Sequence, residues 1–464
     1  MRELTKKYIQ AKLILISLLF VGCDFGDTNI DPTRRTDVDV NLILPALEAQ
    51  TARNQGSIGA RVTGVVIQQY KGTDAQPEAY NNYQLDENVL DTYWRTGLYV
   101  GAMKDARVII EKSKEKNTPH HSGIAKILMA YNLGIATSFW GDVPYSTAFD
   151  ENNEKATYDT QEEIYQTIQT LLDDAISDLN LPAGDIAVGD DDLIYGGNAA
   201  LWIGTARALK ARFYMHLVKR DPDASTKALD ILSKGTIFSN EVEPTFHFGI
   251  EQNAANPIAY FGEDRSGQLA MGDHLLAMLD AENDPRKDKY GVLSGGNYLL
   301  YQRDNKDLYY GQFESPMPLI TYSEILFIKS EANLRNGNLT AADNFFIEAV
   351  NANMEQLGVS PTTPIGNLSS LPTFEAQLER LINQKYIALF GHGTLEAWVD
   401  YKRTGFPQLV PNPNASPSFD PSGVVPRRYI YPITERTTNG NNLEVAITNQ
   451  NGHLLDVDTW AFKN

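Results

Sequence analysis

Glu396, Asp400 and Arg403 have the residue types and spacing that come closest to catalytic chemistry in this chain. Steps of four and three residues place all three side chains on one face of a helix. Two carboxylates about 5–10 Å apart, one with a raised pKa, would suit the acid and base of a glycoside hydrolase. A structural ion-pair network explains the same spacing and is the favoured interpretation.

The other residues that could bind an ion lie in one acidic segment, with Asp185, Asp190, Asp191 and Asp192. Carboxylate oxygens are ligands for calcium, so a calcium cofactor is one interpretation and a solvated turn is the favoured one. The seven histidines show no metal-ligand spacing, and the chain has no phosphate-binding loop, nucleophile elbow or dinucleotide motif. We therefore predict no catalytic residue and no metal site.

The elements that must position these residues are mostly helices, because apolar residues recur at helical spacing over long stretches. Thr160 and Glu163 form a capping box before one stripe, and Asn198 is a candidate N-cap for another. The stripes lie at about 98–109, 124–139, 164–179 and 202–217. Trp140, Trp202 and Trp398 fall in these or similar contexts, so we expect them in the core.

Residues 322–350 carry the spacing of a tetratricopeptide helix pair, with Gly337 at the turn and Ala342, Phe346 and Ala349 on the second helix. Helix pairs are expected at roughly 88–140, 161–219, 223–235 with an unplaced partner, and 322–391. Such repeats stack on their neighbours to bury their apolar faces. We expect a scaffold over about 46–235 and 321–403, with a loop-rich region at about 236–320 and 404–464.

Composition limits the class of protein. The chain has 464 residues, and 42% of them are hydrophobic, which excludes global disorder. Its formal charge of -19 argues against a nucleic-acid partner. The length suits about three domains or one large architecture. No run of 18 apolar residues is present, so no membrane-spanning helix is expected.

The lone cysteine, Cys23, ends a segment that has the features of a secretory signal. Basic residues precede the apolar run 13–21, which is too short to cross a membrane, and Leu19 to Cys23 resembles a bacterial lipobox with Phe20 at a position where leucine is commoner. We expect a signal peptide over 1–22, lipidation of Cys23 and a tether over 23–45, in which Pro32 and Pro45 prevent regular helix. Loss of residues 1–22 would leave a charge near -22.

Taken together, the chain resembles the SusD/RagB-like nutrient-uptake lipoproteins, in the branch called SusD-like 2. Lys385 and Trp398 stand where arginine is more usual in the broader family, which supports this branch. The order and spacing of several segments carry the resemblance: Cys23, 29–33, 139–145, 322–326, 384–390, 396–403, and 428–432 with Glu435.

The resemblance implies an all-α, tetratricopeptide-like superhelix with a large irregular region. It implies a surface-exposed outer-membrane lipoprotein, not an enzyme, that captures a glycan or oligopeptide and passes it to a TonB-dependent, SusC-like transporter. A secreted all-helical glycoside hydrolase and a tetratricopeptide scaffold for a protein partner are the alternatives.

Aromatic residues in the irregular segments are the predicted ligand contacts, because rings with neighbouring amides suit neutral ligands. Tyr80 and Tyr83 lie beside Asn81, Asn82 and Gln84. Trp94 is next to this group, where a helix is expected to begin. The resemblance implies ligand contacts in regions such as these. The second group is Tyr298, Tyr301, Tyr309 and Tyr310. For any single tyrosine, a packing role in the irregular segments is favoured over ligand contact. For Trp94, a place in the core and a role as a ligand platform are equally supported.

Overall fold

The computed structural model describes residues 38–150, 152–237, 239–303 and 305–463. Residues Val40–Asn464 form one compact unit. The predicted signal peptide, the lipidation site Cys23 and most of the predicted tether lie outside the described residues.

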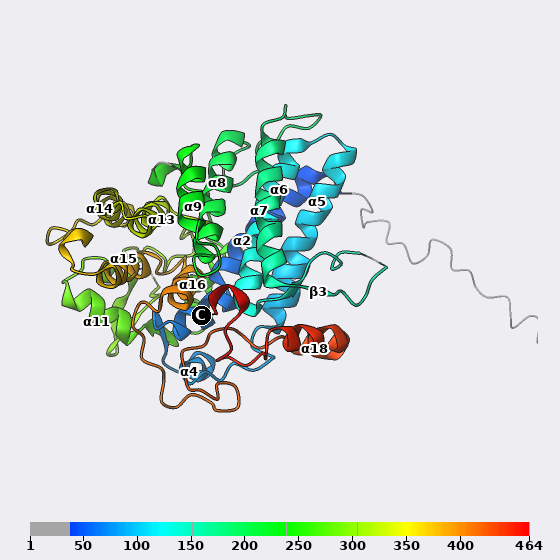
Figure 1. Ribbon diagram of the computed structural model, residues 1–464. Helices are drawn as coiled ribbons and strands as arrows, with labels where there is room; N and C mark the ends of the chain where they lie inside the picture. The colour runs from blue at the N-terminus through cyan, green and yellow to red at the C-terminus, as the bar shows by residue number, and fades with distance from the viewer. Residues whose placement is uncertain (1–37, 151, 238, 304, 464) are drawn as a thin grey trace, which may run out of the picture. The chain divides into compact units, whose positions relative to one another are not determined.

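Helices dominate this unit, as predicted (Figure 1). The α-helices are α2 (Val40–Gly56), α3 (Ile58–Val66), α4 (Ala75–Asn81), α5 (Lys104–Glu115), α6 (Pro119–Trp140), α7 (Gln161–Leu179), α8 (Ala199–His216), α9 (Ala224–Ser233), α10 (Pro257–Asp264), α11 (Asp273–Ala281), α12 (Lys287–Tyr290), α13 (Tyr322–Arg335), α14 (Leu339–Gln356), α15 (Phe374–Ala388), α16 (Thr394–Thr404), α17 (Ile433–Thr438) and α18 (Gly440–Asn449). A π-helix, η2 (Tyr93–Met103), leads into α5, and short 3₁₀ turns are η3 (Asn240–Val242), η4 (Gln252–Ala254), η5 (Leu368–Ser370) and η6 (Trp460–Phe462).

The strands are short and antiparallel. One four-stranded sheet has the order β1-β5-β7-β6, with Tyr70 opposite Met271 and Leu293 opposite Tyr298, and two further pairs are β2–β3 and β4–β8. Their bounds are β1 (Tyr70–Gly72), β2 (Val143–Pro144), β3 (Tyr158–Asp159), β4 (Thr245–Phe246), β5 (Leu269–Met271), β6 (Val292–Ser294), β7 (Asn297–Leu299) and β8 (Met317–Pro318).

The long helices form a continuous stack of neighbours. α5 packs on α6, α6 on α7, α7 on α8 and α8 on α9, in chain order. α9 then packs on α13, which follows it only after the irregular segment 234–321, and α13 packs on α14 and α15. Figure 1 shows this progression from α5 to α14. The predicted helix at 223–235, whose partner could not be placed from the sequence, is α9; it packs against both α8 and α13, and more extensively against α8.

The predicted tetratricopeptide pair is confirmed as α13 and α14. Thr321 caps α13 by accepting a hydrogen bond from the Glu324 backbone N–H, and Gly337 adopts a positive φ of 78° in the turn. Small residues let the two helices approach closely, since the Ser323 and Ser330 hydroxyls donate to the backbone carbonyls of Ala349 and Ala342.

Helix α6 lies at the centre of the core, with nearly every residue buried. Gly134 makes this possible, because a Cβ there would lie 2.4 Å from the Phe213 ring of α8. Trp140, Trp202 and Trp398 are among the largest fully buried side chains, which confirms their predicted place in the core.

The local capping predictions are also confirmed. Thr160 and Glu163 form the full capping box of α7, and the Asn198 side chain accepts a hydrogen bond from the Leu201 N–H at the start of α8.

The predicted tether over 23–45 is wrong at its C-terminal end, because residues 40–45 are helical and Pro45 lies inside α2. Val40, Leu44 and Leu47 are fully buried in the core, where α2 packs against α5, α6 and η2. Burial of these side chains offsets the hydrogen bond that proline removes, a tertiary effect that overrides the local preference.

Among the described residues, the helices are either too short or too polar to cross a bilayer.

Candidate functional site

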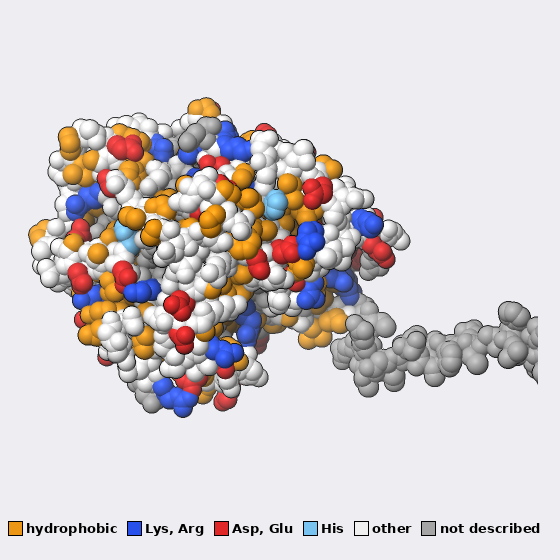
Figure 2. Space-filling view, turned by 90° about the horizontal axis from the view of Figure 1, so that it is seen from below, with side chains coloured by type: hydrophobic (Ala, Val, Ile, Leu, Met, Phe, Trp, Pro, Cys, Tyr) orange, Lys and Arg blue, Asp and Glu red, His pale blue; other side chains and the backbone are white. Residues whose placement is uncertain are grey.

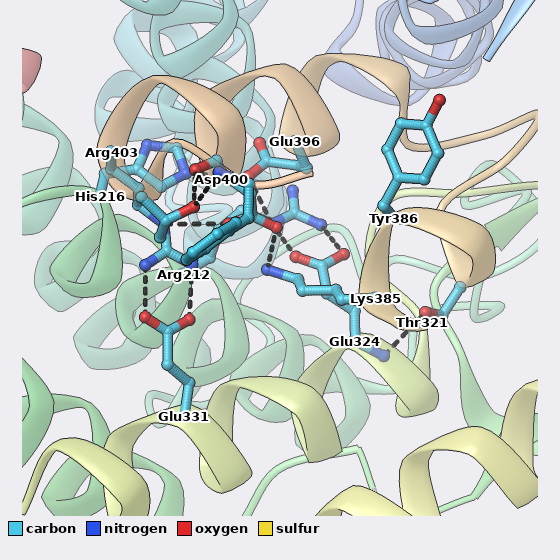
Figure 3. Close-up of polar contacts among 12 residues, drawn as sticks. Arg212, His216, Thr321, Glu324, Glu331, Lys385, Tyr386, Glu396, Asp400 and Arg403 are labelled. Atoms are coloured by element: carbon cyan, nitrogen blue, oxygen red, sulfur yellow. Dashed lines mark hydrogen bonds and ion pairs between the residues drawn. The ribbon is translucent and has the colours of Figure 1, made fainter. Parts of the chain in front are cut away.

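Glu396, Asp400 and Arg403 form part of a buried ion-pair network, the interpretation that the sequence favoured. Arg403 donates to Asp400 and to both carboxylate oxygens of Glu331 on α13. Lys385 Nζ lies 2.9 Å from Asp400 Oδ2. Figure 3 shows these side chains converging between α8, α13, α15 and α16, with Tyr386 pointing away.

A second half of the network lies on α8. Arg212 donates two 2.7 Å hydrogen bonds to the Glu324 carboxylate, and His216 Nε2 lies 2.8 Å from Glu396 Oε2. Burial raises the pKa of Glu396, but Arg212 and His216 outweigh it and lower the pKa to about 2. For Glu331, Arg403 and Arg335 likewise outweigh burial and hold the pKa well below its usual range. A glycosidase acid needs the opposite shift, so these two carboxylates do not fit that role.

The acidic segment at 185–192 has a structural role at Asp192. Its carboxylate accepts the backbone N–H groups of Ile194, Tyr195 and Gly197 and the Trp202 indole N–H. Within the part of the chain that the structure describes, no group of three or more acidic, histidine or cysteine side chains could hold a metal ion. The calcium interpretation gains no support here.

The best candidate for a binding site is an open hollow of about 420 Å³, which we call the 81–412 hollow. It lies between β1, the end of α4, the start of α11 and the proline-rich segment 410–414. Its lining comprises Val65, Gln68, Tyr70, Lys71, Asn81, Tyr83, Gly272, Asp273, His274 and residues 410–414.

Hydrogen bonds between distant segments shape this hollow. The Asn412 side-chain amide donates to the backbone carbonyl of Asn81 at 2.6 Å and to the Asn82 side chain at 3.1 Å. Lys71 and Asp273 form an ion pair of 2.9 Å at the edge of the sheet, with the Asp273 side chain 76% exposed. The hollow thus offers charged and amide groups beside the exposed apolar side chain of Val410.

Two residues of the lining have unusual backbone conformations. Gln68 has a φ of 59° and Tyr83 a φ of 51°, in the left-handed region that costs free energy for residues other than glycine. Such conformations persist where the surrounding structure holds them, and they cluster at ligand sites. This supports the hollow as a functional site.

Four of the predicted ligand-contact residues are buried: Tyr80, Tyr83, Trp94 and Tyr310. Trp94 packs between Tyr99 and Trp140, each ring centre 4.8 Å away, so its surroundings are those of a core residue. Tyr83 lies in the lining of the hollow, where the Asn412 backbone N–H donates to its hydroxyl at 3.3 Å. Burial favours the packing interpretation for these four side chains.

The remaining predicted residues, Tyr298, Tyr301 and Tyr309, are half-buried and lie outside the 81–412 hollow. Tyr298 lies on β7 under the Lys287 ammonium, and Tyr301 donates a 2.5 Å hydrogen bond to Glu263 while stacking on Phe313. Ligand contact remains a prediction for these three.

Sequence reasoning missed Lys71, Asp273, His274 and Asn412, which come from three separate segments. It also missed Tyr260, a 40% exposed ring beside a second hollow of about 650 Å³ formed with Arg53 and residues 251–257. The predicted residues were chosen because aromatic residues cluster in those segments. The exposure of a ring depends instead on which rings the rest of the chain covers.

The lower face of the molecule in Figure 1 carries α4, α18 and the segment 404–432. Figure 2 shows this face, where hydrophobic side chains gather between small groups of both charges. No single sign of charge dominates this view, which suits a neutral or mildly charged ligand.

Comparison with known proteins identifies the family of this helical-repeat scaffold with its loop-built hollow. The model of the SusD-like 2 family, described as starch-binding and associating with the outer membrane, matches residues 32–432. The chain therefore belongs to the SusD-like 2 family, whose members are nutrient- or glycan-binding proteins associated with the outer membrane.

Solved structures share the fold over nearly the whole chain. A chitin-binding protein matches with a TM-score of 0.76 and 22% identity, covering 92% of this chain and 100% of that one. A SusD/RagB family protein from Bacteroides thetaiotaomicron and a SusD homologue from Bacteroides uniformis each match with a TM-score of 0.74, 23% identity and the same coverage. None of the curated protein sequences matches this chain.

Proposed function

We propose that this protein captures a glycan or an oligopeptide in the 81–412 hollow at the cell surface. The observation that carries the proposal is the hollow itself, with its strained lining and its mixed polar and apolar character, on a SusD-like scaffold. The exposed Lys71–Asp273 pair supplies hydrogen-bonding groups, and Val410 with the adjacent prolines supplies apolar contact. The chitin-binding structural neighbour supports a glycan as the cargo.

Capture is the first of two steps, and the second is delivery to a TonB-dependent, SusC-like transporter in the outer membrane. Closure over the barrel would follow ligand binding if the closed state makes better contacts with the ligand. A lipid on Cys23 would keep the protein at the membrane, since several acyl chains give stable attachment. The function is binding without turnover.

A glycan and peptide array tests the cargo. The soluble form lacking residues 1–23 should retain one class of ligand, and the Asp273→Asn variant should retain less of it. If the signals from glycans and from peptides both equal the background of the array, the proposed capture is contradicted. Turnover of mixed glycans that is lost in Glu396→Gln would contradict binding without catalysis.

Gentle solubilisation of membranes tests the partner and the anchor. The full chain should co-purify with a large outer-membrane barrel, and a Cys23→Ala variant should no longer incorporate labelled palmitate. A clean monomer from these membranes would contradict the transporter step without bearing on ligand capture.

A further inference from the structure

A second cleft, distinct from the 81–412 hollow, lies between α11, α14 and α15, and we call it the 282–380 cleft. It encloses about 320 Å³ and is lined by the turn 281–286, by Val350 and Met354 of α14, by residues 361–365, and by Arg380 and Gln384 of α15. Figure 1 shows α14, α15 and α11 along one side of the molecule. The volume is at the lower end of the range for small-molecule sites.

Arg286 makes one wall of this cleft rigid. Its guanidinium is fully buried and donates to Asp284 at 2.6 Å, to Asn353 Oδ1 at 3.0 Å and to Gln384 Oε1 at 2.7 Å. These bonds join the turn to both helices, and the Thr362 hydroxyl donates across the cleft to the Asn283 carbonyl. The cleft is therefore preformed, which lowers the entropic cost of binding.

Arg380 is the charged group in this cleft that contacts the fold through a ring, since its guanidinium carbon lies 6.0 Å from the Phe346 ring centre. The described residues offer its guanidinium neither an ion pair nor a hydrogen bond, and its Nε–H is buried without an acceptor. A buried donor without a partner costs free energy, so such a group calls for an explanation. A guanidinium matches the geometry of a carboxylate through paired N–H donors.

Glu282 provides the opposite charge in the lining of the same cleft. Its carboxylate accepts one hydrogen bond of 3.1 Å from Gln384 and is otherwise exposed, with no cation beside it in the described part of the chain. Gln384 follows Arg380 by one turn of α15, a rise of about 6 Å. The buried side chains of Val350 and Met354 form an apolar wall near these two groups.

We propose that the 282–380 cleft binds a small carboxylic acid that carries a hydrogen-bond donor at its far end. The carboxylate pairs with Arg380, the donor bonds to Glu282, and the body of the ligand packs on Val350 and Met354. A single sugar acid and the free carboxyl end of a dipeptide share this chemistry. The cleft is a site separate from the proposed capture hollow and does not depend on it.

Calorimetric titration of the full chain in detergent tests this site with two acids, glucuronate and alanyl-leucine. Each is paired with a neutral counterpart, glucose and alanyl-leucine amide. We expect saturable binding of at least one acid, at least tenfold tighter than its neutral counterpart. Glucuronate alone would identify a sugar acid as the ligand, alanyl-leucine alone a peptide end, and both a general carboxylate site.

Variants locate the binding. Arg380→Gln should weaken the acid at least tenfold, whereas Arg265→Gln, a change of an exposed arginine just after α10, should leave it unchanged. Equal affinity for acid and neutral counterpart, or no saturable binding of either acid, would overturn the proposal regardless of how the variants fold. An unchanged affinity in Arg380→Gln would overturn it as well.

Discussion

Lys71 and Asp273 combine exposure with a place in the 81–412 hollow, so they test ligand contact without disturbing the fold. Exposed ion pairs contribute about 0–1 kcal/mol to stability, and this pair is 39% and 76% exposed. We expect Lys71→Met and Asp273→Asn to weaken the captured ligand about tenfold, because each removes a hydrogen-bonding group, a loss of about 1.4 kcal/mol. Binding of the array-identified ligand measures the effect.

Asp230→Asn is the matched control, since Asp230 forms an equally exposed ion pair with Lys234 on α9, outside the hollow. Its affinity should equal that of the unmodified protein. If Asp273→Asn and Asp230→Asn bind equally well, the hollow is not the capture site.

Glu243 links stability to pH. Burial raises the pKa of Glu243 to about 8, although the Tyr322 backbone N–H and the Gln356 side chain, each 2.7 Å from it, lower it in part. The protonated form is favoured in the folded state, so its contribution is fully present below pH 4.5 and is lost as pH rises through about 8. Relative to Glu243→Gln, we expect the unmodified protein to lose stability by about 1 kcal/mol per pH unit between these limits.

Urea unfolding at pH 5, 7 and 9 measures this difference. Glu355→Gln, which changes an exposed carboxylate on α14, should follow the unmodified protein at all three values. Parallel loss of stability in the unmodified protein and in Glu243→Gln would show that Glu243 does not carry the effect.

At the scale of elements, the network in Figure 3 joins α8 to three helices that come much later in the chain, α13, α15 and α16. Arg403 on α16 pairs with Glu331 on α13, and Lys385 on α15 pairs with Asp400 on α16. Arg212 on α8 also pairs with Glu324 on α13. Buried charges thus join the earlier helices of the scaffold to the later ones. Each buried charge depends on its partner, because a lone one would be costly.

Arg403→Met should therefore destabilise the protein by about 3–5 kcal/mol, since it leaves Glu331 and Asp400 short of a buried cation. Denaturant unfolding measures the loss. Lys234→Met removes an exposed ion pair of α9 and should change stability by less than about 1 kcal/mol. Similar small losses in both variants would mean that the network contributes little.

At the scale of the whole molecule, the C-terminal residues close the core. Phe462 is fully buried, the Lys402 ammonium lies 3.5 Å from the Trp398 ring centre and 4.3 Å from that of Phe462, and Arg220 donates to the Trp460 carbonyl. The helical core and the loop-rich region are therefore one folded unit, joined where η6 contacts α7 and α16.

Phe462→Ala tests this closure. It removes a buried ring and leaves a cavity, so we expect a loss of about 3–5 kcal/mol in unfolding free energy. Phe374→Ala, the same change at a 44% exposed position on α15, should cost far less. Equal losses, measured by denaturant unfolding, would show that the C-terminal segment packs only weakly on the core.

The sequence by itself determined the elements and their caps. The capping box at Thr160, the N-cap at Asn198, the pair at 322–350 and the buried tryptophans were all predictable, because each depends on residues within a few positions of one another. The carboxylate pattern at 396–403 likewise predicted a network on one helix face. Its partners Arg212 and Glu331 could not be predicted, since they approach only when the stack is complete.

Only the tertiary structure decided the site. Gln68, Asn81, Asp273 and Asn412 meet in one hollow although they come from three distant parts of the chain, and no local pattern links these parts. The same packing buries Tyr80, Trp94 and Tyr310 and leaves Tyr260 40% exposed. Helical periodicity is a short-range property of the chain, whereas the exposure of a ring and the meeting of loops depend on every segment that packs around them.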